Sequence, residues 1–189
     1  MKTWTVDEML AEVPCGDYPR ERIVELWAGR ERVSLSDVLT GLPILNKDRV
    51  WMACRPKALR LETLEGWVVG AVERAVRRAM ATCTNVRWLD WAQGWMRGNR
   101  WGYDAAYAAQ VASHIVVDQA YSACYAASKA AYVLVTSDAH RSLFAYRAFD
   151  GAATAAGDSA IGDRASFAAR DGEFARQVAD LLAKQGEWE

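Results

Sequence analysis

Several sequence features that commonly reveal a function are missing from this chain. The patterns GxSxG, HExxH, GKS and GKT do not occur, so no nucleophile elbow, metalloprotease helix or phosphate-binding loop is predicted. The 4 cysteines include no CxxC pair, so we expect reduced thiols rather than a disulfide framework or a zinc site. No apolar run is long enough for a secretory signal or a membrane span. These absences favour a cytoplasmic protein that is not an enzyme, carries no cofactor and has no membrane contact.

Neither sign of charge is in excess. The chain has 189 residues with 23 basic and 24 acidic side chains, which gives a formal net charge of −1. This balance gives no reason to expect a polyanionic partner. The length suits one domain, or one domain with a small N-terminal subdomain.

An alanine-rich tract, from Tyr103 to Ala156, is the most informative part of the chain. Its first part, YDAAYAAQVASHIVVDQAYSACYAASKAAYVLV, contains neither proline nor glycine, and alanine is the best helix former. A single helix of this length would measure about 80 Å, whereas a domain of this size is about 40 Å across. We therefore predict a helix that continues through Ile115–Val117 and breaks at Thr136–Asp138, with a second break at Gly157–Asp158.

The remaining helices are predicted from caps and apolar stripes. Two capping boxes are expected in the first 60 residues, Thr5 with Glu8 and Ser34 with Asp37. Asn46 and Asn85 are predicted to cap further helices. A long helix is expected over residues 63–83, with Arg74, Arg77 and Arg78 on its solvent side, and a last helix after Asp171.

These elements predict an all-α fold. It is a multi-helix bundle with short N-terminal helices and a long alanine-rich helical array. An N-terminal short-helix subdomain is expected at residues 1–60 and the helical bundle at residues 61–189, together forming one compact unit.

In helical projection the alanines of the tract lie on one side and the tyrosines on the other. The second strip contains Tyr103, Tyr107, Gln110, His114, Tyr121, Tyr125, Ser128 and Tyr132. Tyrosine is favoured at binding hot spots, so Tyr107, His114, Tyr121 and Tyr125 are candidate partner-binding residues. The alternative is that the rings pack into a groove with only their hydroxyls in water. The small alanine face would admit a close neighbouring helix, or a second copy of the chain in a homodimer.

A metal site is the weakest interpretation of this tract. His114 and Asp118 at i,i+4 could both ligate, and Asp138 with His140 could add ligands. Catalytic zinc needs three protein ligands, and nothing fixes a third. A side-chain hydrogen bond or ion pair is the commoner outcome at this spacing, so no metal is predicted.

Tryptophan and arginine concentrate just before the alanine tract. Trp88, Trp91 and Trp95 share one helical face and are predicted to point into the core. Arg97, Arg100 and Trp101 follow in a predicted loop, where an exposed Trp–Arg pair would be a binding anchor. Together with Arg74, Arg77 and Arg78, this region from 74 to 101 also permits the alternative of nucleic-acid binding, in which aromatics stack on bases and arginines hold phosphates.

Four segments of the chain resemble a known group. They are SLSDVLTGLPILNKDRVWMACRPKALRLETLEGWVVGAVERAVRRAM from Ser34, WLDWAQGWMRG from Trp88, the alanine array, and EFARQVADLL from Glu173. Their pattern is similar to that of an alanine-rich, immunity-protein-like family of small phage and bacterial proteins, over most of residues 34–182. The family supplies no established catalytic residues.

The resemblance implies an accessory protein of a phage or mobile element that binds and inhibits a host macromolecular target. The implied targets are a host defence complex, as for an anti-CRISPR inhibitor, or a toxin, as for an immunity protein. The expectation is therefore a protein partner, with nucleic acid as the alternative and a metal-dependent helical enzyme as the least favoured one.

Overall fold

The computed structural model describes residues 2–12, 14, 16–56, 58–116, 118–133, 136, 138–158 and 163–184, without the side chains of 118, 138, 139 and 163. Over these residues the chain forms ten α-helices and one two-stranded sheet, which confirms the predicted all-α bundle. The elements are β1 (Thr3–Trp4), α1 (Val6–Ala11), α2 (Arg20–Trp27), β2 (Val33–Ser34), α3 (Leu35–Thr40), α4 (Asn46–Ala53), α5 (Leu61–Met80), α6 (Val86–Met96), α7 (Gly102–Ser113), α8 (Asp118–Tyr132), α9 (Asp138–Asp158) and α10 (Asp163–Leu182).

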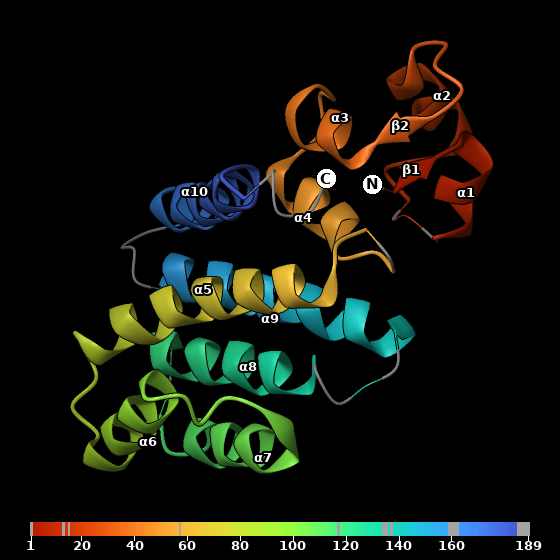
Figure 1. The fold of residues 1–189 in the computed structure, drawn as a ribbon. Coiled ribbons are helices and arrows are strands. Elements are labelled where there is room, and N and C mark those ends of the chain that lie inside the picture. The colour runs from red at the N-terminus through yellow and green to blue at the C-terminus, as the bar shows by residue number, and fades with distance from the viewer. Residues whose placement is uncertain are drawn as a thin grey trace.

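The helices from α5 onward form a bundle around α8 (Figure 1). Helix α8 packs against α7, α5 and α9, while α10 lies against α9 and α4. The short elements from β1 to α4 gather at one end of the bundle. Helix α5 begins at Leu61, at the predicted boundary between the two parts, and α4 joins them through its contacts with α9 and α10.

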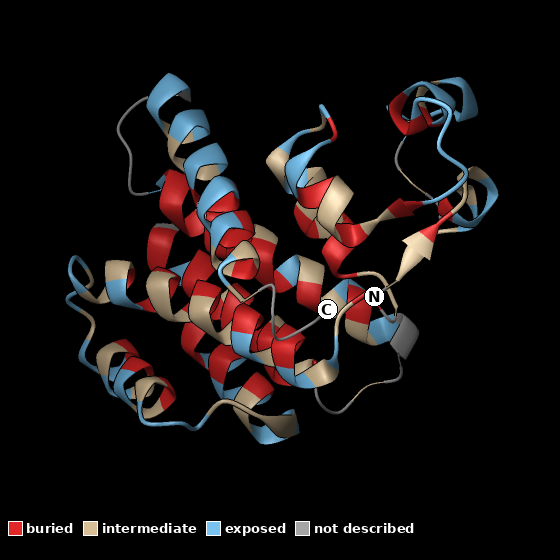
Figure 2. Ribbon diagram, turned by 45° about the horizontal axis from the view of Figure 1, so that its top comes forward, coloured by how far each residue is buried: buried red, intermediate tan, exposed pale blue. Residues whose placement is uncertain are grey.

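Small side chains fill the interior where α5, α8 and α9 meet. Buried residues gather inside the bundle in Figure 2, and alanine is the commonest of them on α8 and α9. At Gly151 on α9, an added Cβ would lie 3.0 Å from Tyr125 and 3.1 Å from Ala126 of α8. Such side chains allow helices to approach closely. Most of the alanine face is thus used inside the monomer, although Ala108 of α7 is exposed.

The predicted burial of α6 tryptophans is confirmed for Trp88 and Trp95, whereas Trp91 is half-buried against the core. Trp88, Ala92 and Trp95 of α6 are fully buried, and the Nε1 of Trp88 lies 3.0 Å from the Sγ of Cys124 on α8. Burial raises the pKa of the Cys124 thiol to about 12, so the thiol stays protonated at neutral pH.

A short antiparallel ladder organises the N-terminal part. Thr3 pairs with Ser34 and Trp4 with Val33, and both Trp4 and Val33 are fully buried. No strand was predicted here, because two residues are too few to show the alternation of a strand.

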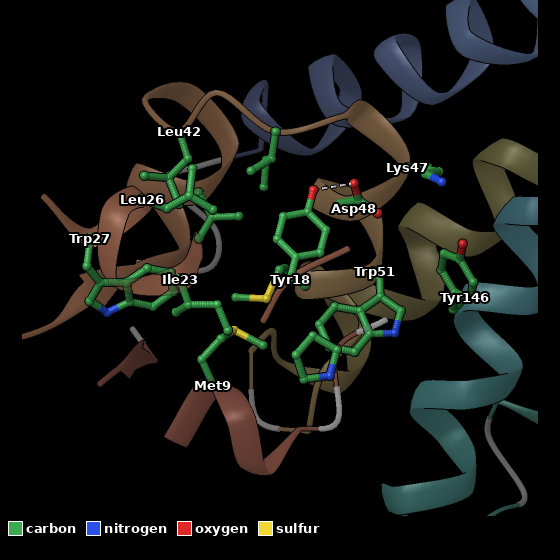
Figure 3. Close-up of a pocket in the computed structure, with 14 residues that line it drawn as sticks. Met9, Tyr18, Ile23, Leu26, Trp27, Leu42, Lys47, Asp48, Trp51 and Tyr146 are labelled. Atoms are coloured by element: carbon green, nitrogen blue, oxygen red, sulfur yellow. Dashed lines mark hydrogen bonds between the residues drawn. The ribbon is translucent and has the colours of Figure 1, made fainter. Parts of the chain in front are cut away.

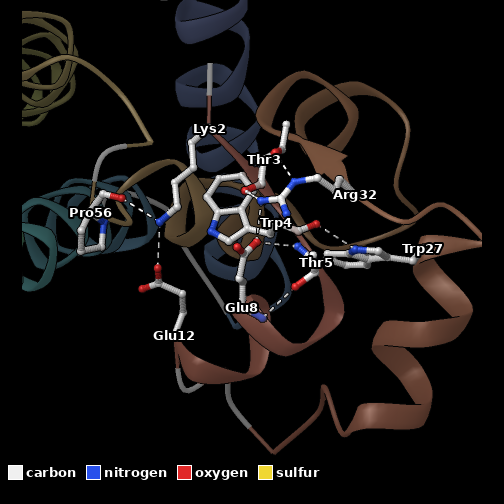
Figure 4. Close-up of polar contacts among 9 residues, drawn as sticks. All are labelled: Lys2, Thr3, Trp4, Thr5, Glu8, Glu12, Trp27, Arg32 and Pro56. Atoms are coloured by element: carbon white, nitrogen blue, oxygen red, sulfur yellow. Dashed lines mark hydrogen bonds and ion pairs between the residues drawn. The ribbon is translucent and has the colours of Figure 1, made fainter.

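Side chains tie β1 to its surroundings (Figure 4). The Nζ of Lys2 bonds to Glu12 at 2.9 Å and to the carbonyl of Pro56 at 2.8 Å. The indole of Trp27 donates to the carbonyl of Trp4 at 3.1 Å. The start of the chain is thus fixed to both α1 and the segment that leads into α5.

Of the four N-cap residues predicted from the sequence, three are confirmed, including Asn85 of α6. Both capping boxes are present, Thr5 with Glu8 and Ser34 with Asp37. The prediction for Asn46 is wrong: the cap is Leu45, which gives no side-chain hydrogen bond, and Asn46 is the first helical residue. Its Oδ1 instead accepts a bond from Arg49 at 2.9 Å.

Two helix boundaries in the second half also differ from the prediction. The expected continuous helix through Ile115–Val117 is wrong, since α7 ends at Ser113 and α8 begins at Asp118. Three successive β-branched residues there have poor helix propensity, and the turn lets α7 fold back onto α8. Helix α10 begins at Asp163 rather than after Asp171, and the three alanines and two arginines between these positions favour a helix there.

An ion cluster joins α5 to α10. The carboxylate of Glu173 is only 2% exposed and bonds to Arg74 at 3.0 Å and to Arg78. Arg74 also pairs with Asp180 at 2.7 Å. Arg74 and Arg78 therefore do not form the solvated face predicted from the sequence.

Among the described helices, none combines the length and apolarity that crossing a bilayer requires.

Replacing Glu173 with Gln should destabilise the fold by about 3 kcal/mol, because half-buried Arg78 loses its acidic partner and Arg74 keeps only Asp180. Urea unfolding measures this loss. Glu62→Gln, at an exposed position of the same α5, should change stability by less than about 0.5 kcal/mol. Equal effects at the two sites would show that the Glu173 cluster does not stabilise the contact of α5 with α10.

The same substitution at two glycines should have opposite effects. Gly151→Ala should cost about 1–3 kcal/mol, since its Cβ would press on Tyr125 and on the backbone of Ala126. Gly172→Ala on α10 meets no atom within 4 Å, so it should stabilise by about 0.5–1 kcal/mol through helix propensity. Thermal unfolding of both variants distinguishes them. A Gly151→Ala protein as stable as Gly172→Ala would contradict the close packing of α8 on α9.

Candidate functional site

The solvent-facing side of α8 consists almost entirely of tyrosine. Of the side chains described on this helix, all are buried except Tyr121, Tyr125, Lys129 and Tyr132. These four follow the spacing i, i+4, i+8 and i+11, so they form one stripe along the helix. The stripe exists because the other described side chains, which are alanines and serines apart from Gln119 and Cys124, are covered by α5, α7 and α9.

Helix α7 continues this aromatic stripe. Tyr103 and Tyr107 are 64% and 69% exposed, and the ring of Tyr103 meets that of Tyr132 edge-on with 5.7 Å between centroids. This contact joins the start of α7 to the end of α8, so the two helices run antiparallel. We call the five residues Tyr103, Tyr107, Tyr121, Tyr125 and Tyr132 the tyrosine surface.

Helix α9 holds part of the tyrosine surface in place. The ring of Tyr132 stacks on Phe144 with centroids 5.0 Å apart. The ammonium group of Lys129 lies 4.9 Å from the centroid of Tyr125 and 6.0 Å from that of Phe144. Burial, and secondarily the charge of Arg147, lowers the pKa of Lys129. Cation–π contacts of this kind contribute about 0.5–1 kcal/mol at exposed sites, so they favour the observed ring positions.

Most residues of the strip predicted from the sequence are at least partly exposed, although they lie on two helices instead of one. Tyr107, Gln110 and Tyr121 are exposed, with Tyr121 at 50%, and His114 is exposed as the C-cap of α7. Tyr125 is half-buried, and Ser128 is buried, unlike its predicted position on the strip. For the exposed tyrosines, the alternative in which the rings fill an internal groove does not apply.

The predicted Trp–Arg anchor is arranged differently from expectation. Trp101 is half-buried as the N-cap of α7, and Arg97 is exposed. Arg100 turns inward: its Nε donates to the carbonyl of Trp95 at 2.9 Å, and its Nη2 pairs with Glu73 at 2.7 Å. Arg100 thus joins the end of α6 to α5 rather than projecting toward a partner.

The predicted arginine cluster on α5 is also divided. Arg77 is exposed, whereas Arg74 and Arg78 are engaged by Glu173. A phosphate would have to compete with that buried carboxylate for both guanidinium groups. The region from 74 to 101 therefore offers fewer free cations than its sequence indicates.

The metal interpretation loses its geometric basis. His114 lies after the last turn of α7 and Asp118 begins α8, so the two do not share one helical face. The side chains of Asp118 and Asp138 are outside the described residues. Within the part of the chain that the structure describes, no group of three potential metal ligands occurs.

A pocket in the N-terminal part was missed by the sequence analysis. It has a volume of about 320 Å³ and is lined by residues of α1 to α4 together with Tyr146 of α9. The lining residues are spread over five helices and the loops between them, and no one helix supplies more than four, so no local sequence pattern predicts the pocket. The nearest signal was the number of aromatic residues, which does not say which of them share a cavity.

Comparison with protein-family models, with curated proteins and with solved structures finds no match to this chain. Function is therefore inferred from the chemistry and geometry of these sites.

Proposed function

We propose that this chain is a non-enzymatic protein that binds another protein through the tyrosine surface. The observation that carries the proposal is the solvent-facing stripe of α8, which presents three tyrosines and one lysine on an otherwise buried helix. Contiguous exposed aromatic residues are uncommon on a monomer and are typical of interaction sites.

The chemistry of tyrosine favours this role. Each ring offers a large apolar area with a hydroxyl at its edge, and only two side-chain torsions must be fixed on binding. The contacts of Tyr103 with Tyr132, and of Tyr132 with Phe144, already restrict these torsions. Preorganised side chains lose less entropy in a complex, so more of the contact energy appears as affinity.

Exposed aliphatic residues enlarge this surface. Val111 on α7 and Ile115 after it are 46% and 38% exposed. An interface needs an apolar centre with a polar rim, and exposed Gln110 and His114 lie beside these residues in the sequence. The composition suits a protein partner better than a nucleic acid, which requires cations to hold its phosphates.

The nature of the partner is proposed from the sequence resemblance alone. The segments from Ser34, Trp88 and Glu173 resemble an immunity-protein-like family of phage and bacterial proteins. On that basis we propose a cytoplasmic accessory protein of a phage or mobile element. It would inhibit a host defence complex, as an anti-CRISPR protein does, or neutralise a toxin.

Nucleic-acid binding is less well supported. Of the five arginines from 74 to 100 considered for it, three pair with acidic residues of the same chain. Phosphate contacts would give affinity that falls steeply with salt. Binding of duplex or single-stranded DNA that decreases strongly between about 50 and 200 mM salt would favour this alternative.

Substitutions on the tyrosine surface should abolish partner binding while the fold is retained. Tyr107→Ala and Tyr121→Ala each remove an exposed ring, and loss of a tyrosine hot spot costs about 2 kcal/mol or more. We expect each variant to weaken binding by more than about tenfold. The assay is a tagged pull-down from nuclease-treated host lysate, followed by titration of the captured protein.

Phe167→Ala is the matched control, since Phe167 is a 72% exposed aromatic residue on α10, outside the tyrosine surface. Circular dichroism should report the same helix content in all three variants. The proposal is contradicted if a stoichiometric partner binds Tyr107→Ala and Tyr121→Ala as tightly as the unaltered protein, or if Phe167→Ala alone loses it.

A further inference from the structure

The pocket of the N-terminal part has an apolar end. Its walls there are formed by Met9 of α1, by Ile23, Leu26 and Trp27 of α2, and by Leu42 after α3 (Figure 3). All five residues are buried and belong to the hydrophobic core. A volume of about 320 Å³ falls at the lower end of the range for small-molecule sites. The size suits a ligand comparable to one large aromatic group with a short chain.

The opposite end of the pocket carries polar groups. Asp48, Tyr18 and Tyr146 lie at this end, and Trp51 lies between Tyr18 and Tyr146 in Figure 3. The hydroxyl of Tyr18 donates to Oδ2 of Asp48 at 2.6 Å. Burial, with the nearby charges of Asp150 and Asp48 as lesser causes, raises the pKa of Tyr146 to about 12. The hydroxyl of Tyr146 is therefore protonated and uncharged at physiological pH.

Asp48 lacks a counter-ion of its own. Its carboxylate is half-buried and accepts a bond from the neutral Tyr18, but it forms no ion pair with any described residue. The neighbouring Lys47 also lines the pocket, but its side chain is exposed and forms no ion pair with Asp48. A carboxylate beside an apolar cavity is stabilised by a cation that enters with a ligand, since partial burial strengthens the attraction.

The aromatic walls add to this preference. The rings of Tyr18, Trp51 and Tyr146 come from the loop before α2, from α4 and from α9, and they lie at the polar end of the cavity. Trp51 is held by Arg55, whose guanidinium lies 4.1 Å from the ring centroid. Aromatic faces together with a carboxylate recognise an ammonium group through cation–π and ionic contacts.

We propose that this pocket binds a small primary amine carried on an aromatic body, with its ring among Ile23, Leu26 and Trp27 and its ammonium group on Asp48. The site lies on elements other than α7 and α8, so the proposal is independent of the tyrosine surface.

Three probes with the same indole ring test the proposal by calorimetric titration of the full chain. Tryptamine carries the ammonium group, 3-ethylindole is its neutral counterpart, and indole-3-acetate carries a carboxylate. Because a hydrogen bond to a charged group contributes about 1.5–3 kcal/mol, tryptamine should bind at least about tenfold more tightly than 3-ethylindole. Indole-3-acetate should bind most weakly.

The Asp48→Asn variant tests whether the preference for tryptamine over 3-ethylindole depends on the Asp48 carboxylate. Asparagine keeps an oxygen that can accept the bond from Tyr18 but removes the charge, so tryptamine should lose about tenfold in affinity and 3-ethylindole should lose little. Lys47→Gln is the neighbouring control and should not weaken tryptamine binding.

Four results would overturn the proposal: no binding of tryptamine, equal affinity for tryptamine and 3-ethylindole, tighter binding of indole-3-acetate, or unchanged tryptamine affinity in Asp48→Asn. The first three use only the unaltered protein, so they hold even if Asp48→Asn fails to fold.

Discussion

The close packing of α8 between α5, α7 and α9 is the constraint on which the rest of the structure depends. Side chains as small as alanine allow three neighbours to cover one helix, and they leave a single stripe of α8 in contact with solvent. Apart from Gln119 and Cys124, the buried side chains described on α8 are alanines and serines, and the aromatic residues lie on that stripe. The same packing that stabilises the bundle therefore determines where Tyr121, Tyr125 and Tyr132 lie.

Helix α9 connects this arrangement to the N-terminal pocket. Phe144 supports Tyr132 of the tyrosine surface, and Tyr146, two residues later, lines the pocket. Residues two apart on a helix point to different sides. One turn of α9 thus contributes to two sites that face different parts of the molecule, which makes each accessible without rearrangement of the other.

Local patterns in the sequence predicted much of this fold. The spacing of Trp88 and Trp95 indicated burial, and the separation of alanines from tyrosines indicated which residues face solvent. Features that depend on distant residues could not be predicted. The pairing of Arg74 with Glu173 spans 99 positions. The turn after Ser113 reflects the gain from packing α7 on α8, which outweighs the helix propensity of the alanines around it. The pocket gathers residues from five helices and from the loops between them, so no periodicity within one segment predicts it.

Nitration of tyrosines, followed by peptide mapping, tests most directly whether the packing of α7 and α8 leaves the tyrosines of both helices exposed to solvent. Tetranitromethane attacks accessible phenolates, so Tyr107 and Tyr121 should be modified early. Tyr146 should be modified last, because its pKa is raised to about 12 and its ring is half-buried. If Tyr107 and Tyr121 react as slowly as Tyr146 in the folded protein, they are covered, and the tyrosine surface is not a free binding face.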